Sequence, residues 1–275
     1  MAAPRPAARL VVRWTIGDVS GYGFEALHLS TWGARRVFGP HARYVVCVNS
    51  VPLARARAQV GPVPAEVEWL DVSQDLCPVI ARAIDTGMAE GVGWKFAPIR
   101  VDPDRYELHL DNDCVLWALP NAIAHWLADT EPTCLLAEDV ITLLGQFQAR
   151  CGPAPRNSGI RGVPPGFDLA GAFAAALELT GVTLRSELDE QGLVTFACSR
   201  DRAPHVVRED DVAICGPFPP HHQHLGRCGA HFVGLNAHRL PWSYAGLSGE
   251  AHVRQHWMQL RPQLYRAVGL GPRRR

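Results

Sequence analysis

The stretch Tyr106-Glu-Leu-His-Leu-Asp-Asn-Asp-Cys-Val115 decides how this chain folds. Apolar and polar residues alternate up to Leu110, which is the pattern of a β-strand. The alternation stops at Asp111 and Asp113, and a helical pattern starts at Pro120. A strand that ends in carboxylates and leads to a helix puts hard oxygen ligands at the carboxyl edge of a sheet, where open α/β folds bind ligands. Two carboxylates this close repel each other and favour a divalent cation, which can in turn carry a diphosphate.

Upstream of this stretch, strand and helix patterns alternate. Largely apolar runs at 9–15, 44–49 and 67–72 predict strands, and the second is apolar enough for a buried parallel strand. Apolar residues at helical spacing predict helices over 24–38 and 52–60. This order predicts an α/β fold with a mostly parallel, Rossmann-like sheet flanked by helices.

Downstream, the patterns predict further helices and strands. We expect a helix from Pro120, a strand at 133–137, a helix at 168–180, a helix capped by Ser186, and short strands at 205–208 and 211–214. After Glu250 a helical C-terminal extension follows, which Pro262 should kink or split. No internal repeat or linker divides the sequence, so we expect one domain over 1–275, with a core at 9–242 and the extension at 249–270.

Composition narrows the class of protein. Lys plus Arg equals Asp plus Glu at 27 each, so nothing in the net charge suggests binding to nucleic acid. The eight cysteines include no Cys-x-x-Cys pair, which favours reduced thiols in a cytoplasmic protein over a disulfide framework. The N-terminus lacks the apolar stretch of a signal peptide, and no run of about 18 apolar residues predicts a membrane span.

The segment Leu110-Asp-Asn-Asp113 with its apolar tail resembles the Asp-x-Asp motif of nucleotide-sugar glycosyltransferases with the GT-A fold. A second copy, Asp102-Pro-Asp104, is assigned to an exposed turn because of its proline. The resemblance implies that Asp111 and Asp113 hold Mn²⁺ or Mg²⁺, with Asn112 beside them at the donor site.

The first loop is similar to that of family 8 glycosyltransferases, the group of glycogenin and bacterial lipopolysaccharide glycosyltransferases. In that family an aspartate and an aromatic ring grip the uracil, and Asp18 and Tyr22 match them, although a glycine-rich turn with a surface tyrosine is an equally open reading. Basic residues before the metal motif reach the diphosphate in the family. Lys95 and Arg100 match these, unless they are surface cations.

Two later segments also resemble the family in the expected order. Asn157-Ser-Gly159 resembles its Asn-x-Gly segment, whose asparagine meets the sugar, although turn chemistry also explains it. Asp189-Glu-Gln191 resembles a segment of GT-A transferases that lies beside the donor sugar and the acceptor. A role in capping the helix is an equally open alternative. The resemblance therefore implies Asn157 and Asp189 as catalytic-site residues.

The segment His231-Phe-Val-Gly234 resembles the late family 8 motif, whose histidine is the third protein ligand of the metal. A histidine ligand favours Mn²⁺ somewhat over Mg²⁺. Family members continue with Lys-Pro-Trp, but here Pro241-Trp242 comes late and Leu240 replaces the lysine. Arg239 or His238 is the alternative cation for the diphosphate.

The sequence therefore predicts a metal-dependent glycosyltransferase that moves a sugar from a nucleotide-sugar, most simply a UDP-sugar, to an unknown acceptor. Retention of anomeric configuration is implied by the resemblance alone. Two alternatives stay open. One is an inactive GT-A-like binding domain, and the other is a metal-dependent hydrolase that uses zinc on the histidines of 221–231.

Overall fold

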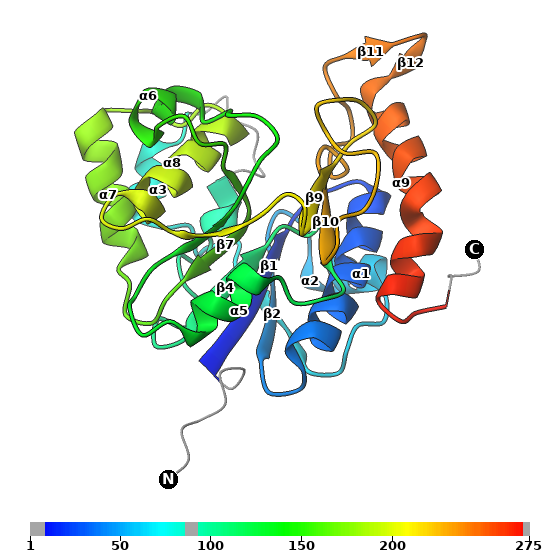
Figure 1. The fold of residues 1–275 in the computed structure, drawn as a ribbon, viewed down its shortest axis with the longest axis horizontal. Coiled ribbons are helices and arrows are strands. Elements are labelled where there is room, and N and C mark those ends of the chain that lie inside the picture. The colour runs from blue at the N-terminus through cyan, green and yellow to red at the C-terminus, as the bar shows by residue number, and fades with distance from the viewer. Residues whose placement is uncertain (1–8, 86–92, 272–275) are drawn as a thin grey trace.

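The computed structural model describes residues 9–85 and 93–271. Its centre is a seven-stranded sheet (Figure 1). In spatial order the strands are β3 (Val67–Asp71), β2 (Arg43–Val48), β1 (Leu10–Ile16), β4 (Tyr106–Leu110), β7 (Asn157–Val163), β6 (Leu135–Ala137) and β8 (His205–Val207). Within the described ranges β7 alone runs against the others, because it pairs antiparallel with both β4 and β6. The mostly parallel α/β sheet is thus confirmed.

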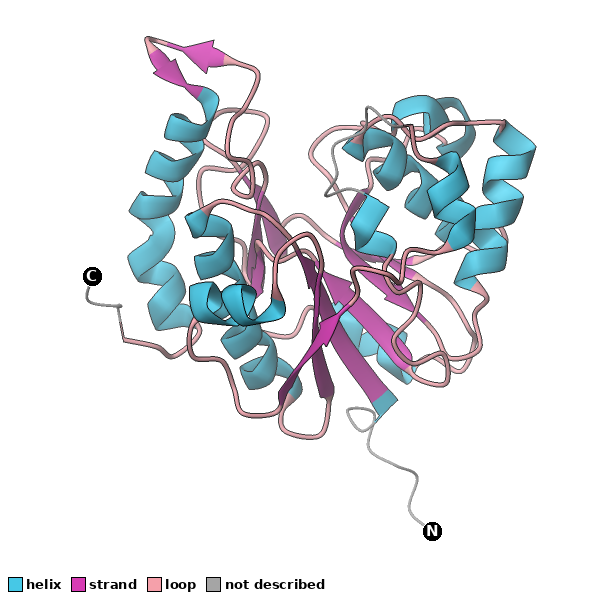
Figure 2. Ribbon diagram, turned by 180° about the vertical axis from the view of Figure 1, so that it is seen from behind, coloured by secondary structure: helices cyan, strands magenta, loops and turns pink. Residues whose placement is uncertain are grey.

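Helices cover both faces of this sheet (Figure 2). One face carries α1 (Gly21–Phe38), α2 (Leu53–Val60) and α5 (Asn121–Ala128). The other face carries α3 (Pro78–Ala83), η2 (Trp94–Phe96), η3 (Gly145–Phe147), α6 (Gln148–Cys151), α7 (Leu169–Thr180) and α8 (Glu187–Ser199). The period of two in each strand separates the cores: Leu135 faces the first, and its neighbour Leu136 faces the second.

A second, smaller layer lies against α1. It consists of the sheet β5 (Cys114–Leu116), β10 (Gly229–Phe232) and β9 (Val212–Cys215), and of the long helix α9 (Gly249–Ala267). Glu25 of α1 fastens α9, because its carboxylate accepts hydrogen bonds from Trp257, Arg261 and Tyr265. A hairpin of β11 (Ser243–Tyr244) and β12 (Leu247–Ser248) projects beyond the start of α9 (Figure 1).

Helix ends follow local signals that the sequence carries. Ser20 caps α1, since its side chain accepts a hydrogen bond from the backbone N–H of Gly23, and Ser186 caps α8 in the same way. Gly181 closes α7 with a left-handed φ of 65°. Pro262 does not split the C-terminal helix as one alternative held, because α9 continues through it. None of the helices in the described ranges combines the length and apolarity needed to cross a membrane.

Five strands of the structure are missing from the prediction: β5, β7, β10, β11 and β12. β7 begins at Asn157, where turn chemistry was the alternative, and β10 contains His231 of the family motif. β7 contains glycines for a packing reason. A Cβ on Gly162 would come within 2.7 Å of the Trp126 ring, so the glycine lets that ring lie over the strand. The glycines of β7 carry no side chain, so the alternation of apolar and polar side chains that predicts a strand is missing there.

Candidate active site

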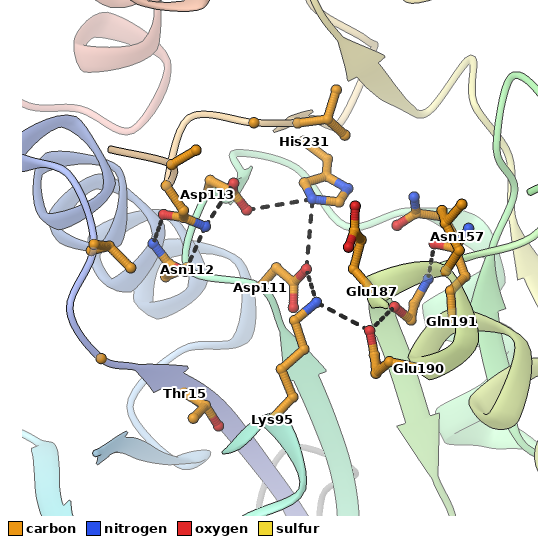
Figure 3. A pocket seen from close by; sticks show the side chains of 18 of the residues that line it. Thr15, Lys95, Asp111, Asn112, Asp113, Asn157, Glu187, Glu190, Gln191 and His231 are labelled. Atoms are coloured by element: carbon orange, nitrogen blue, oxygen red, sulfur yellow. Dashed lines mark hydrogen bonds and ion pairs between the residues drawn. The ribbon is translucent and has the colours of Figure 1, made fainter. Parts of the chain in front are cut away.

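A cavity of about 680 Å³ opens at the carboxyl edge of the central sheet. Because β1, β2 and β4 run parallel, residues that follow them meet there, including Asp18, Asn49 and Asp111. The start of α8 and the segment after β10 form the opposite walls. Figure 3 shows the polar side chains that gather in this cavity.

Asp111, Asp113 and His231 form a compact group in the cavity (Figure 3). Asp111 directly follows β4, and Asp113 directly precedes β5. β10 pairs antiparallel with β5 and sets His231 opposite Cys114, next to Asp113. His231 Nε2 lies 3.4 Å from Asp113 Oδ1 and 3.8 Å from Asp111 Oδ2, and one ligand atom of each residue lies within 4.8 Å of the others.

These three residues fit a divalent metal ion. Asp113 Oδ1 is buried and accepts no hydrogen bond among the described residues, so it is free to be a ligand. Two carboxylates and one imidazole are a donor set that suits Mn²⁺ or a similar ion. In the described part of the chain this is the one group of three acidic, histidine or cysteine side chains with ligand atoms so close together.

Electrostatics within the group couple its members. Burial raises the pKa of Asp111, but Lys95 and His231 lower it more, so the net pKa lies below its ordinary value. Burial lowers the pKa of His231, but Asp113 and Asp111 raise it more, and the net pKa lies above 6.5. The site is therefore built around the negative charge of its two carboxylates.

Lys95 reaches the same group from η2. Its Nζ lies 2.8 Å from Asp111 Oδ2 and 3.4 Å from Glu190 Oε2 (Figure 3). Burial lowers the pKa of Lys95, but Asp111 and Glu190 raise it more, so the ammonium form is favoured. Among the residues described as lining the cavity, Lys95 is the one lysine or arginine. Lys95 therefore lies inside the cavity, beside the metal group.

Buried polar side chains hold Lys95 and Glu190 in place. Arg161 of β7 donates to Glu190 Oε1 at 3.2 Å and to the carbonyl of Lys95 at 2.8 Å. The same guanidinium lies 2.9 Å from His109 Nδ1. Burial, Arg161 and Arg13 hold the pKa of His109 well below its ordinary value, so this imidazole is neutral and accepts the hydrogen bond. Glu190 is thereby fixed at the cavity floor.

Asn157 also lines the cavity. Its Nδ2 donates to Asp139 Oδ2 at 2.9 Å, and its Oδ1 accepts from Gly159 N at 2.8 Å. Gly159 must be glycine here, because a Cβ would lie 2.3 Å from Cε1 of His231. The Asn-x-Gly segment therefore places an amide in the cavity and makes room for the histidine of the metal group.

Asp18 belongs to the exposed part of the cavity lining. It follows β1 and lines the cavity, as does Asn49, and its Oδ1 lies 3.6 Å from Nε2 of His238. Gly17 lets the two strand ends approach, since a Cβ there would lie 2.5 Å from Asn49 Oδ1. Asp18 is therefore among the predicted site residues that the fold brings to the cavity.

The structure places Tyr22 and Arg239 outside the residues that line the cavity. Tyr22 lies in the first turn of α1 and packs on the core shared with α9, where Arg254 lies 5.8 Å from its ring centre. Arg239 is exposed, and so is His238. Ala237 and Leu240, on either side of them, face the cavity instead. No aromatic ring or second cation of the predicted kind therefore reaches the cavity from these described positions.

Arg100 and Asp189 have structural partners away from the cavity. Arg100 pairs with Glu107 and donates to four backbone carbonyls, including those of Pro164 and Phe167. The Asp189 carboxylate accepts backbone N–H bonds from Gln146 and Arg185, and so joins α8 to η3. The capping alternative describes Asp189, because its side chain points to the helix start rather than to the cavity.

Glu190, Gln191 and Asn236 line the cavity but are missing from the predicted site. The first two belong to the Asp-Glu-Gln segment that the prediction selected, and the helical turn decides which of its members face inward. Asn236 bonds to Asp113 and Asn112, and only the fold brings it there. Asn112 itself lines the cavity, but its Nδ2 donates hydrogen bonds to the carbonyl of Gly23 and to Asn236 Oδ1.

The histidines at 221, 222 and 224 do not form a zinc site in the described structure. His221 lines the cavity, whereas His222 pairs with Glu209 and His224 is exposed. Only His231 of this segment joins two acidic side chains. The geometry therefore gives no support to a hydrolase that uses these histidines together.

Solved structures with a similar fold are glycosyltransferases of the GT-A type. The galactosyltransferase LgtC, solved with donor and acceptor sugar analogues, has a TM-score of 0.55 and 12% identity, with 94% of this chain and 99% of LgtC covered. Mouse xyloside xylosyltransferase 1 has a TM-score of 0.51 and 13% identity over 75% and 87% of the two chains. GlyE of Streptococcus pneumoniae has a TM-score of 0.50 and 11% identity over 96% and 61%.

These similarities confirm the GT-A fold and the resemblance stated above, but identities this low establish the fold alone. Comparison with models of known protein families found no match, and comparison with curated proteins found none either. The activity must therefore be argued from the cavity and its residues.

Proposed function

We propose that the chain is a metal-dependent glycosyltransferase that moves a sugar from a nucleotide-sugar donor to an acceptor. The observation that carries this proposal is the group of Asp111, Asp113 and His231 at the carboxyl edge of a GT-A sheet, inside a cavity of about 680 Å³. Such a cavity is large enough for a small-molecule donor. Mn²⁺ is the ion that these ligands favour, and UDP is the nucleotide that the family 8 resemblance favours.

The metal, when bound, would neutralise the diphosphate and make it a better leaving group. Lys95 is the protein cation in position to stabilise the same developing charge, because it lies beside Asp111 at the metal group. Asp18, which also lines the cavity, would accept a hydrogen bond from the base. These roles orient the donor along the cavity from Asp18 to the metal group.

Asn157, Glu190 and Gln191 form the wall where the sugar of such a donor would lie. Glu190 is held by Lys95, Arg161 and Ser158, and Asn157 is held by Asp139, so both side chains are positioned before substrate arrives. We propose retention of anomeric configuration, as in the family 8 enzymes that the motifs resemble. All eight cysteines are free thiols, which supports a cytoplasmic protein.

Thermal unfolding with UDP, with and without Mn²⁺, tests the donor site. A ligand at a hundred times its dissociation constant should add about 2.7 kcal/mol to the free energy of unfolding. We expect UDP to stabilise the native protein only when Mn²⁺ is present, and the variant Asp113→Ala to lose this effect. If UDP and other nucleoside diphosphates with Mn²⁺ leave the melting temperature unchanged, the transferase proposal fails. A positive result would be followed by a screen of UDP-sugars for metal-dependent UDP release.

A further inference from the structure

We propose that Asn236 is a positioning residue for the metal site, which aims one oxygen of Asp113 at the ion. Asn236 lies in the segment after β10, far in sequence from the Asp-x-Asp motif, and contacts the motif through its side-chain amide. The inference rests on the proposed function, because it takes Asp111, Asp113 and His231 to be metal ligands.

The Asn236 amide makes three hydrogen bonds to the motif. Asn112 Nδ2 donates to Asn236 Oδ1 at 2.6 Å, and Asn236 Nδ2 donates back to Asn112 Oδ1 at 3.0 Å. The same Nδ2 donates to Asp113 Oδ2 at 2.9 Å. An amide nitrogen has two hydrogens, so both donors of Asn236 are used, one for each motif residue.

This arrangement leaves the two oxygens of Asp113 with different roles. Oδ2 accepts the hydrogen bond from Asn236, whereas Oδ1 is buried, accepts none among the described residues, and lies 3.4 Å from His231 Nε2. A carboxylate free to rotate would exchange these oxygens. The bond to Asn236 therefore selects Oδ1 as the ligand atom, and a neutral amide does so without cancelling the carboxylate charge.

Asn236 can position Asp113 because Asn236 is itself held. Its backbone carbonyl accepts a hydrogen bond from the backbone N–H of Ser20 at 2.9 Å, which does not depend on the Ser20 side chain. Gly23 packs closely against the amide, since a Cβ there would lie 2.4 Å from Asn236 Oδ1. The start of α1, the motif and the segment after β10 thus form one hydrogen-bonded unit.

Isothermal titration of the full-length protein with MnCl₂ tests the inference. We expect Asn236→Ala to weaken Mn²⁺ binding by about 10- to 100-fold, as for other residues that orient metal ligands. The control is Ser20→Ala, which removes a hydrogen bond to the same segment and the cap of α1 but leaves the amide contacts of Asn236 in place. It should lower the melting temperature and keep Mn²⁺ affinity within about twofold.

Each outcome decides the inference. Unchanged Mn²⁺ affinity in a folded Asn236→Ala protein overturns it, and so does an equal loss in Ser20→Ala, because the order of the segment alone would then explain the effect. If Asn236→Ala does not fold, Asn236→Ser keeps a polar group but cannot reach Asp113, and the same loss is expected. If the native protein binds neither Mn²⁺ nor Mg²⁺, the metal dependence in the proposed function falls together with this inference.

Discussion

Two parts of the cavity lining are built in opposite ways. At the metal group the side chains of Asp113, His231 and Asp111 are only 4%, 7% and 12% exposed, and neighbouring groups hold them in place. At Asp18 the side chain is 59% exposed, and that of its neighbour His238 is 58% exposed. Charges act strongly where water is excluded and weakly where it is not. We therefore expect substitutions to have large effects at the metal group and small ones at Asp18.

The largest effect is expected for Asp113→Asn, which keeps the shape of the side chain but removes one ligand charge. Transferase activity should fall on the order of 10³-fold, because the metal then no longer neutralises the leaving group. UDP release from UDP-sugars at saturating Mn²⁺ measures this loss.

Asp104→Asn is the matched control, since Asp104 belongs to the second Asp-x-Asp copy. That copy forms a turn in which Asp102 Oδ1 accepts a hydrogen bond from the backbone N–H of Asp104. Activity should stay within about twofold of the native protein, as for other exposed positions. Equal losses in the two variants would contradict a special role for the buried carboxylates.

Lys95→Met is expected to have the next largest effect. It removes the cation beside Asp111 and leaves Glu190 with Arg161 and Ser158 as partners. We expect turnover to fall about 10²-fold, because the leaving diphosphate loses a preorganised positive charge. The control is Arg239→Ala, at the exposed alternative position. An effect of Arg239→Ala as large as that of Lys95→Met would show that the segment moves onto the donor and brings this cation in.

Binding of Mn²⁺ should depend on pH through His231. Its pKa lies above 6.5 because Asp113 and Asp111 outweigh the effect of burial. The metal needs the neutral imidazole, so below this raised pKa the affinity should fall by up to about tenfold for each pH unit, and above it the affinity should level off. Titrations with MnCl₂ between about pH 5.5 and 8, the range in which histidine side chains usually change charge, measure this pH dependence. His231→Asn should bind weakly at all these values, without the same slope.

The sequence was most informative where local pattern and site coincide. The alternation up to Leu110 is enough to predict β4, which leads directly to Asp111 and Asp113. The parallel pairing of β1, β2 and β4 then brings the carboxyl ends of these strands to one edge of the sheet. His231 was predicted only through the family motif. The pairing of β10 with β5 explains the position of His231. The sequence pattern does not predict β10, because the strand is short and contains a glycine.

The remaining site depends on orientation and long-range contact, which a sequence does not display. Asp189 and Glu190 are neighbours, but the turn of α8 aims Glu190 into the cavity and Asp189 at η3. Arg100 looks like a second donor cation until the fold gives it Glu107 and four carbonyls as partners. Asn236 enters the site from more than a hundred residues away, through contacts to side chains that only the folded protein brings together.

The smallest effect is expected at Asp18, in the exposed part of the lining, and it separates two residues that the family resemblance treats as a pair. Asp18→Ala removes one hydrogen-bond acceptor in a solvated position, so affinity for UDP with Mn²⁺ should fall only about 2- to 10-fold. Tyr22→Ala should leave this affinity unchanged and lower the melting temperature, because the ring packs on the core between α1 and α9 rather than in the cavity. Isothermal titration with UDP and thermal unfolding of both variants provide the two readings. If Tyr22→Ala loses more UDP affinity than Asp18→Ala does, the start of α1 must rearrange and bring the Tyr22 ring onto the base. The ligand would then order this part of the cavity.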